Sequence, residues 1–302
     1  MPEIRPIYEF ILWNNCNNNC TFCHQKHNRK KYPSKFLSND EKYDSIKAVY
    51  SFIEKLNTQK TFHVLLMGGE IFDIGLPSKV KSELFSLGYL IAHYMKRNII
   101  EYLYINSNLI YPDSALVTEF LNIFKEVKLL ERIKFTSSYD IAFRFKTELD
   151  ESYHNIFCER LAVQYNEMAK VQNCILTEKA CDYINGMDDT KLTEKFFGNT
   201  WAFNFIPYIK LNKSNPDELA PTRKKLLSTL VRINRCVPDF LDRYTENLKA
   251  EQPRYIYEYN KGMLEYASSG NAECGHNENF RYVYNDSADC FICDVLNLQK
   301  LK

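Results

Sequence analysis

Short apolar runs and amphipathic stretches alternate along the first two thirds of the chain. The apolar runs are rich in β-branched and aromatic residues, which is typical of buried strands. They predict six strands, over residues 7–13, 61–67, 101–105, 132–137, 171–176 and 201–206. The stretches between them predict helices over residues 38–56, 77–97, 112–126, 153–170 and 178–197. Strands that alternate with helices predict an α/β fold with a parallel sheet or barrel.

Local start signals agree with this pattern. Ser38 and Glu41 have the spacing of a capping box, in which each side chain satisfies a backbone N–H of the other residue. Pro77 and Pro112 suit the first turn of a helix, where no backbone N–H is needed. These signals fix where three of the predicted helices begin.

The pattern changes after about residue 215. One more helix is predicted over residues 221–234, and a tyrosine-rich segment follows it. Two short strands are predicted at 281–284 and 290–292, around an Asn285-Asp286 turn. We therefore expect a core at residues 1–214 and a smaller C-terminal cap at residues 215–302.

Composition and charge exclude several classes of protein. The 302 residues carry 39 basic and 38 acidic side chains, so a net charge of +1 provides no general field for nucleic acid or a membrane surface. No apolar stretch approaches the length of a membrane span, and the first residues lack the layout of a signal peptide. We expect a cytoplasmic protein. Its ten cysteines are then better explained as metal ligands or buried thiols than as disulfides.

Three cysteines lie within eight residues, directly after the first predicted strand: Cys16, Cys20 and Cys23. Soft thiolates favour iron–sulfur clusters, zinc or copper(I). The next cysteine is Cys158, so no fourth thiolate is close in the sequence. Three thiolates leave one coordination position open, which a catalytic metal site requires. A zinc site completed by His24 or His27 is the alternative.

Polar and glycine residues follow three more of the predicted strands. Gly68-Gly69-Glu70 follows the second strand, Asn106-Ser107-Asn108 the third, and Ser137 to Asp140 the fourth. In parallel α/β folds the chemistry gathers beyond the carboxyl ends of the strands. The cysteines and these residues are therefore expected at the same end of the sheet.

The cysteine spacing, with Phe22 just before the last cysteine, resembles the signature of the radical S-adenosylmethionine (radical SAM) superfamily. The resemblance implies a partial (β/α)6 TIM-like barrel and a [4Fe-4S] cluster on Cys16, Cys20 and Cys23. It also implies that SAM chelates the open iron and is cleaved reductively to a 5′-deoxyadenosyl radical, which abstracts a substrate hydrogen. An electron donor such as flavodoxin or ferredoxin would then be a partner.

The same resemblance, which covers residues 5–210, assigns cofactor contacts outside the cysteine loop. Gly68, Gly69 and Glu70 would hold the SAM amino group, and Phe22 would lie near the adenine. Weaker matches to SAM contacts are Asn106, Ser138 and Asp140. Asn108 stands where many relatives carry a glycine, so the match after the third strand is partial.

A second group of cysteines lies near the C-terminus: Cys274, Cys290 and Cys293, with Cys236 as a further candidate ligand. The layout resembles the twitch or SPASM extension of radical SAM enzymes, which carries auxiliary clusters. Asn285 stands in the glycine position of that pattern, and a full SPASM set is absent. An auxiliary [4Fe-4S] cluster, a zinc ion and no metal are the three alternatives.

The substrate is less well specified than the chemistry. Relatives with twitch or SPASM extensions often modify peptides or proteins, which favours a peptide. Against it, a first strand at about residue 7 leaves no room for an N-terminal leader-peptide-binding domain. A small molecule (nucleotide, nucleoside or sugar) is the alternative, because the basic segment 24–31 would suit a phosphate if it is not simply a solvated loop. The non-enzymatic alternative is a zinc or iron–sulfur protein for structure or electron transfer.

Overall fold

The computed structural model describes residues 5–18, 20, 23, 36–56, 60–139, 147–197, 201–207, 219–237, 239–242, 254–258, 263–267 and 298. Its strands are β1 (Ile7–Ile11), β2 (Phe62–Met67), β3 (Ile100–Asn106), β4 (Ile133–Tyr139), β5 (Ala169–Leu176), β6 (Ala202–Pro207), β7 (Arg254–Glu258) and β8 (Met263–Ala267). Its helices are α2 (Asn39–Leu56), α3 (Ser78–Lys96), α4 (Ala115–Glu126), α5 (Glu148–Gln164), α6 (Glu178–Gly186), α7 (Asp189–Phe197) and α8 (Arg223–Cys236), with a 3₁₀ turn, η1 (Leu130–Arg132).

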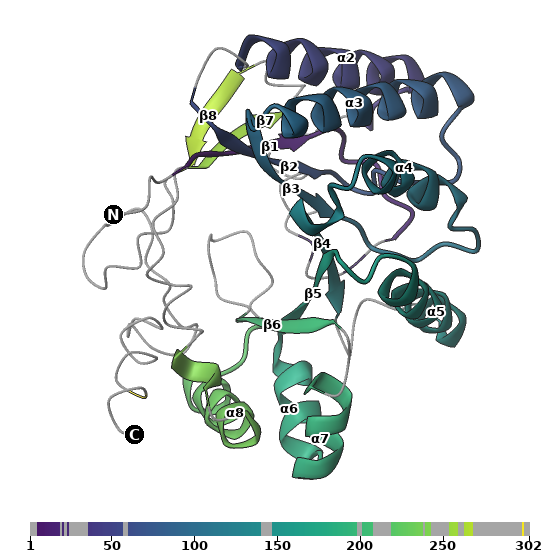
Figure 1. Cartoon of the computed structure of the whole chain (residues 1–302). Helices are drawn as coiled ribbons and strands as arrows, with labels where there is room; N and C mark the ends of the chain where they lie inside the picture. Colours follow the sequence, from purple (N-terminus) through teal and green to yellow (C-terminus); the bar gives the residue numbers. More distant parts are fainter. Residues whose placement is uncertain are drawn as a thin grey trace.

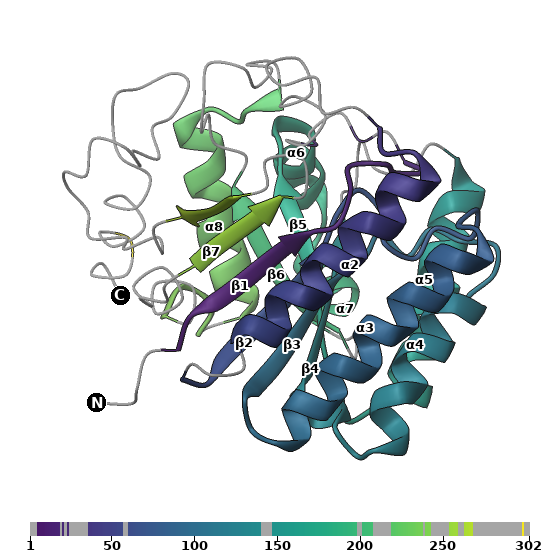
Figure 2. The same cartoon turned by 90° about the horizontal axis from the view of Figure 1, so that it is seen from above.

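All eight strands belong to one sheet, in the order β6-β5-β4-β3-β2-β1-β7-β8. Along this order, each strand from β6 through β1 to β7 is parallel to its neighbour, and β8 is antiparallel to β7. Figure 1 shows that this sheet is curved and that the helices line its outer, convex side. Seen from above, α2, α3 and α4 run side by side along that face (Figure 2). The predicted α/β partial barrel is confirmed.

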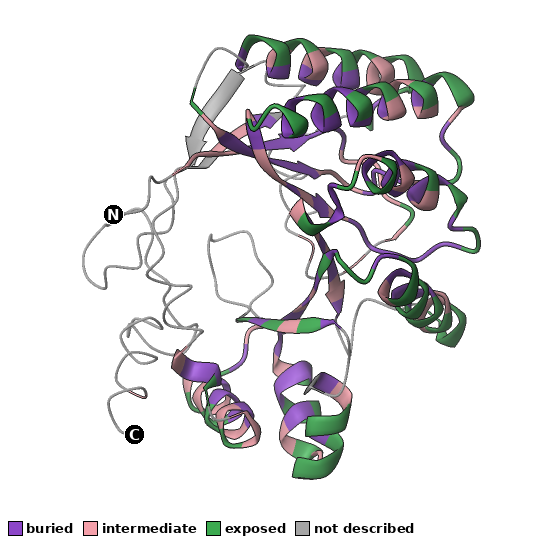
Figure 3. Ribbon diagram, in the orientation of Figure 1, coloured by how far each residue is buried: buried purple, intermediate pink, exposed green. Residues whose placement is uncertain are grey.

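Alternation along the strands separates two faces. In β3, Leu103 and Ile105 are fully buried in the core beneath the helices, whereas Tyr104 and Asn106 point to the concave side. Figure 3 shows the same division, with buried residues on the sheet and on the inner faces of the helices. The described helices cover the convex face, so side chains of the strands that point to the concave face are not packed beneath these helices.

A second apolar cluster lies beneath β5 and β6. It joins the sheet residues Cys174 and Phe205 to Phe196 of α7 and to Leu230 and Ile233 of α8. Helix α8 and the β7–β8 pair thus attach residues beyond 214 to the same sheet that the core builds. A division of the chain at residue 214 stays a prediction.

The six predicted strands are all present, and three predicted helices differ in extent. Helix α4 begins at Ala115, with Ser114 as its N-cap residue, and not at Pro112. Helix α5 ends at Gln164 and not at residue 170, because β5 already begins at Ala169. Helix α5 begins at Glu148, because Thr147 and Asp150 form a capping box that the sequence pattern did not reveal. The helix predicted over residues 178–197 is divided into α6 and α7, because the backbone adopts an extended conformation at Met187, directly after Gly186. Strands β7 and β8 were not predicted, and the strands predicted at 281–284 and 290–292 lie outside the described residues.

Within the described ranges, no helix has both the length and the apolar character needed to cross a bilayer.

Candidate cofactor site

The three clustered cysteines lie on the loop that follows β1, at the carboxyl end of the sheet. Cys16, Cys20 and Cys23 are half-buried, and none of them forms a disulfide within the described residues. The backbone N–H of Cys23 donates to the carbonyl of Cys20 at 3.3 Å, which makes a tight turn of the last two cysteines. The loop follows Ile11, the last residue of β1, and the role of its cysteines as metal ligands stays a prediction.

The glycine pair after β2 holds this loop in place. The N–H of Gly69 donates to the carbonyl of Trp13 at 2.7 Å, and the N–H of Glu70 donates to that of Asn15 at 2.8 Å. A β-carbon on Gly68 would lie 2.6 Å from the Trp13 oxygen, and one on Gly69 would overlap the backbone of Asn15. Both positions therefore need glycine because two backbones approach closely there.

Glu70 is turned into the protein and is only 1% exposed. Its carboxylate accepts hydrogen bonds from the N–H of Phe72 at 2.9 Å, the N–H of Asn108 at 2.7 Å and the hydroxyl of Ser107 at 3.1 Å. Burial raises the pKa of Glu70, and hydrogen bonds from Tyr111 and Asn108 oppose that rise. A direct contact between this carboxylate and the SAM amino group stays a prediction, and it would require Glu70 to exchange partners.

Ser107 and Tyr111 complete the buried group around Glu70. Their hydroxyl groups are in direct hydrogen-bond contact with each other. Burial and the neighbouring Glu70 charge raise the pKa of Tyr111 well above its ordinary value, so its phenol stays protonated. The three side chains form a closed polar cluster beside the cysteine loop.

The loop after β3 reaches across to the first cysteine. The side-chain amide of Asn108 lies 3.6 Å from the sulfur of Cys16 and 2.6 Å from the side-chain oxygen of Asn17. In return, the Asn17 amide donates to the carbonyl of Ile110 at 2.9 Å. The N–H of Asn18 also points at the Cys16 sulfur, at 3.4 Å. Two N–H donors therefore face one sulfur atom.

The burial of the Cys16 thiol raises its pKa more strongly than these two donors lower it. Burial raises the pKa of the Cys16 thiol to about 11, and the charge of Glu70 adds to the rise, whereas Asn18 and Asn108 lower it. A thiol with such a pKa is protonated at neutral pH when no metal is bound. Metal binding must displace that proton, because the thiolate is the ligand.

The donor set fits an iron–sulfur cluster. Three thiols on one loop supply soft ligands, and N–H groups aimed at a sulfur stabilise it as a thiolate. In the part of the chain that the structure describes, no three Cys, His, Asp or Glu side chains lie close enough to hold a single metal ion. A cluster of several atoms is wider than one ion, so its ligands stand farther apart.

Two further predicted contacts lie on the concave face near the strand ends. Asn106, the last residue of β3, is half-buried and hydrogen-bonded to the hydroxyl of Thr136. Ser138 of β4 is half-buried and alternates with the buried Ser137, which points to the helices. Both face the interior of the partial barrel, and their roles stay predictions.

The remaining predicted site residues are not shown near the cysteine loop by the described part of the structure. Phe22 and Asp140 lie outside the described residues, as do Cys274, Cys290 and Cys293. Cys236 ends α8, where it is half-buried and packs against the second apolar cluster. Whether these cysteines share a metal stays a prediction.

Sequence reasoning missed the polar cluster behind the site. The sequence pattern singles out Ser107 only as part of Asn106-Ser107-Asn108 and does not single out Tyr111, so their contact with each other and that of Ser107 with Glu70 were not predicted. His154 is also fully buried, with its ring 3.2 Å from the Ser137 hydroxyl and 3.8 Å from the Cys158 sulfur. The one sequence signal that could have pointed to this cluster was Asn108, which stands where a glycine was expected and contacts both Glu70 and Cys16.

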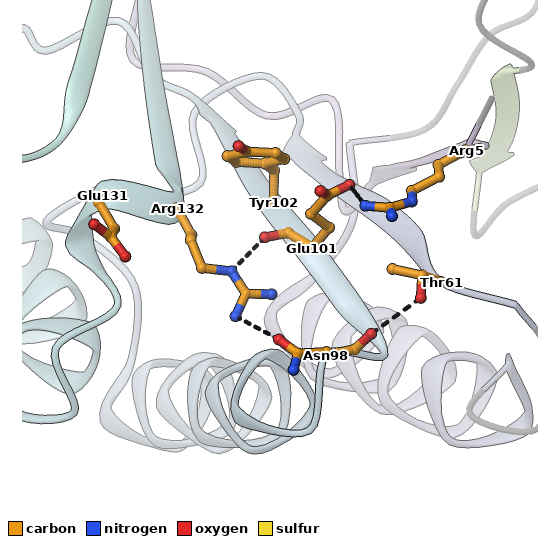
Figure 4. A pocket seen from close by; sticks show the side chains of 7 residues that line it. All are labelled: Arg5, Thr61, Asn98, Glu101, Tyr102, Glu131 and Arg132. Atoms are coloured by element: carbon orange, nitrogen blue, oxygen red, sulfur yellow. Dashed lines mark hydrogen bonds and ion pairs between the residues drawn. The ribbon is translucent and has the colours of Figure 1, made fainter. Parts of the chain in front are cut away.

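A separate cavity of about 530 Å³ lies at the opposite, amino end of the strands (Figure 4). The Arg132 guanidinium donates to the carbonyls of Glu101 at 2.7 Å and Met95 at 2.8 Å, and Arg5 forms an ion pair with the Glu101 carboxylate. Beside them, burial lowers the pKa of His63 to about 4. Both arginines of this cavity therefore bind the Glu101 carboxylate or backbone carbonyls.

No protein-family model matches the chain, and no curated protein matches it. Among solved structures, the chain is similar to SuiB of Streptococcus suis. The SuiB structure bound to precursor peptide SuiA matches with 13% identity and a TM-score of 0.51, over 95% of this chain. The structure bound to S-adenosylmethionine matches with 12% identity and a TM-score of 0.53, over 98% of this chain.

The matched region covers 65% of the SuiB chain in the peptide complex, which is less than two thirds of its length. It covers 74% of the SuiB chain in the complex with S-adenosylmethionine. At such low identity the likeness concerns the path of the backbone. This chain therefore shares the α/β partial-barrel fold of SuiB.

Proposed function

We propose that this chain is a radical SAM enzyme that modifies a peptide or protein. The observation that carries the proposal is the position of three thiols, Cys16, Cys20 and Cys23, beyond the carboxyl end of β1. Functional groups of parallel α/β folds gather at that end. The fold is shared with a protein solved bound to S-adenosylmethionine, which agrees with a SAM site here.

In this proposal the three cysteines hold a [4Fe-4S] cluster and leave one iron for SAM. When bound, the cluster and SAM together supply a one-electron cleavage that yields the 5′-deoxyadenosyl radical. A low-potential donor such as flavodoxin or ferredoxin provides the electron. The protein contributes orientation and exclusion of water.

The residues around the loop would position these groups. Gly68 and Gly69 let the β2 loop pack directly on the backbone before the cysteines, which fixes the loop relative to the sheet. Asn106 and Ser138 point into the concave face, where SAM and substrate would meet. Glu70 either accepts the SAM ammonium after a change of partners or, as the structure has it, anchors the loop after β3.

A peptide is the favoured substrate. SuiB, which shares the fold, is solved bound to a precursor peptide. In our proposal the segment 215–302 is a twitch-like cap, and Cys236, Cys274, Cys290 and Cys293 hold an auxiliary [4Fe-4S] cluster. If short peptides raise the SAM-cleavage rate and nucleotides do not, the peptide assignment is supported; the reverse result would replace it with a nucleotide.

The test of the function is anaerobic reconstitution with iron and sulfide, followed by dithionite and SAM. We expect 5′-deoxyadenosine from the wild type and only background from Cys20→Ala. Cys181→Ala is the matched control, because Cys181 is buried in the second apolar cluster and should leave the product unchanged. Iron-loaded wild type that makes no 5′-deoxyadenosine, or Cys20→Ala that makes as much as wild type, would overturn the proposal.

A further inference from the structure

Asn108 occupies a position where many members of the radical SAM superfamily carry a glycine, and a glycine has no side chain to donate a hydrogen bond. Here the side chain is 8% exposed and closes the gap between the loop after β3 and the cysteine loop. Its amide nitrogen lies 3.6 Å from the sulfur of Cys16. Asparagine in place of glycine therefore adds a side-chain contact to Cys16, a proposed cluster ligand.

The orientation of the Asn108 amide is fixed by its own oxygen. That oxygen accepts the backbone N–H of Ile110 at 2.8 Å. An N–H donor can only face an acceptor, so the NH₂ group must point the other way, to Asn17 and Cys16. The amide thus offers a proton to the sulfur rather than a lone pair.

The backbone of Asn108 is fixed as well. Its N–H donates to the Glu70 carboxylate at 2.7 Å, and the neighbouring Ser107 hydroxyl donates to the same carboxylate. Glu70 is buried and is itself tied to the N–H of Phe72. A buried, charge-assisted anchor of this kind leaves the Asn108 side chain little freedom.

We infer that Asn108 is a positioning residue that donates an N–H···S hydrogen bond to the Cys16 thiolate and raises the reduction potential of the cluster. The inference rests on the proposed function, because it requires a cluster on Cys16. Hydrogen bonds to cluster sulfurs set the potential, along with charge and solvent exposure. A donor stabilises the more negative, reduced cluster, so its removal makes reduction harder.

The experiment is a redox titration of the reconstituted full chain, with the reduced cluster measured by EPR. For Asn108→Ala we expect a tenfold lower ratio of reduced to oxidised cluster at the wild-type midpoint, which is 59 mV for a one-electron couple. Asn108→Asp keeps the size but replaces the donor with an oxygen, so its ratio should fall further. Iron content and circular dichroism report whether each variant is loaded and folded.

The matched control is Asn17→Ala, which removes both loop contacts of the Asn17 side chain, to the Ile110 carbonyl and to the Asn108 amide. It keeps the Asn108 amide beside Cys16, because the Ile110 N–H still holds the Asn108 oxygen. If Asn108 only held the loops together, this control and Asn108→Ala would shift the potential equally, and that result overturns the inference. An unchanged potential in both Asn108 variants also overturns it, while the proposed function stands. A wild type that binds no cluster overturns both.

Discussion

The two ends of the parallel sheet use polar side chains in opposite ways. At the amino end, Arg132 binds backbone carbonyls and Arg5 binds the Glu101 carboxylate, so both arginines are held by the protein itself (Figure 4). At the carboxyl end, buried polar groups converge on Glu70 and on a loop whose cysteines remain half-buried. The first arrangement stabilises the fold, whereas in our proposal the second presents ligands to a metal cluster.

The contrast explains why cavity size is a poor guide to function here. The amino-end cavity has a volume of about 530 Å³, yet the ion pair and the backbone bonds already occupy its two arginines. The cysteine loop combines soft ligands with N–H donors aimed at one sulfur. Chemistry depends on which donors and acceptors converge, and mutations at the two ends should therefore have different effects.

The largest expected effect is at the carboxyl end. Replacing Cys16, Cys20 and Cys23 together with alanine should abolish 5′-deoxyadenosine formation, a loss of at least about 1,000-fold, because no iron remains open for SAM. Iron and sulfide counts on the same variant test the C-terminal cysteines. We expect about four irons to remain, as one auxiliary cubane contains four; a count of zero would remove the auxiliary cluster.

The glycine pair gives the next largest effect. Gly69→Ala places a β-carbon in the backbone of Asn15, so the cysteine loop must move, and we expect a loss of about 3 kcal/mol in the free energy of unfolding. Gly186→Ala is the control, since a β-carbon there meets nothing within 4 Å, and it should be neutral or slightly stabilising. Urea denaturation of both variants is the measurement. Equal stability of the two would contradict the close backbone approach.

A mutation at the amino end should change stability without changing chemistry. Arg132→Met leaves backbone carbonyls at the end of α3 and the start of β3 without their donor, at a cost of about 2 kcal/mol. Arg97→Met removes an exposed arginine nearby and should cost less than about 0.5 kcal/mol. Thermal unfolding measures both, and the folded Arg132 variant should cleave SAM at the wild-type rate. A loss of SAM cleavage in the folded Arg132→Met variant would contradict the claim that the amino end of the sheet serves stability alone.

The smallest effect concerns pH. The unfolded chain protonates His63 near its ordinary pKa of 6.5, whereas burial lowers the folded pKa to about 4. The unfolded state therefore binds more protons between these values, and stability falls as the pH falls. From pH 7 to 5.5 this one group should cost about 1 kcal/mol.

The measurement is urea unfolding at the two pH values for wild type and for His63→Gln. The wild type should lose about 1 kcal/mol more than the variant, which has no group that titrates at this position. The same pH dependence in both proteins would show that His63 is not buried as the structure has it.

The regular part of the fold could be predicted because each element carries its own signal. Apolar runs fixed the six strands of the core, and the alternation of strands with helices fixed the parallel arrangement. Strands β7 and β8 escaped prediction because their tyrosine-rich sequence has no clear period, and because β7 pairs with β1 across the length of the chain. Long-range pairing is not encoded in a local pattern.

The site was predictable only as far as its motifs reach. Cysteine spacing located the loop, and the glycine pair located its neighbour. The burial of Glu70, by contrast, depends on Ser107 and Tyr111 from another loop, and nothing in their local sequence indicates it. Contacts between loops arise from tertiary packing, so the sequence could name the candidate residues without assigning their partners.

The central claim is that three cysteines hold an iron cluster with one open iron. EPR of the anaerobically reconstituted, dithionite-reduced protein, recorded with and without SAM, tests it most directly. We predict a [4Fe-4S] signal that requires Cys16, Cys20 and Cys23 and that changes when SAM is added. A signal that ignores SAM, or a protein that holds only a zinc ion with four ligands at that loop, would contradict the account.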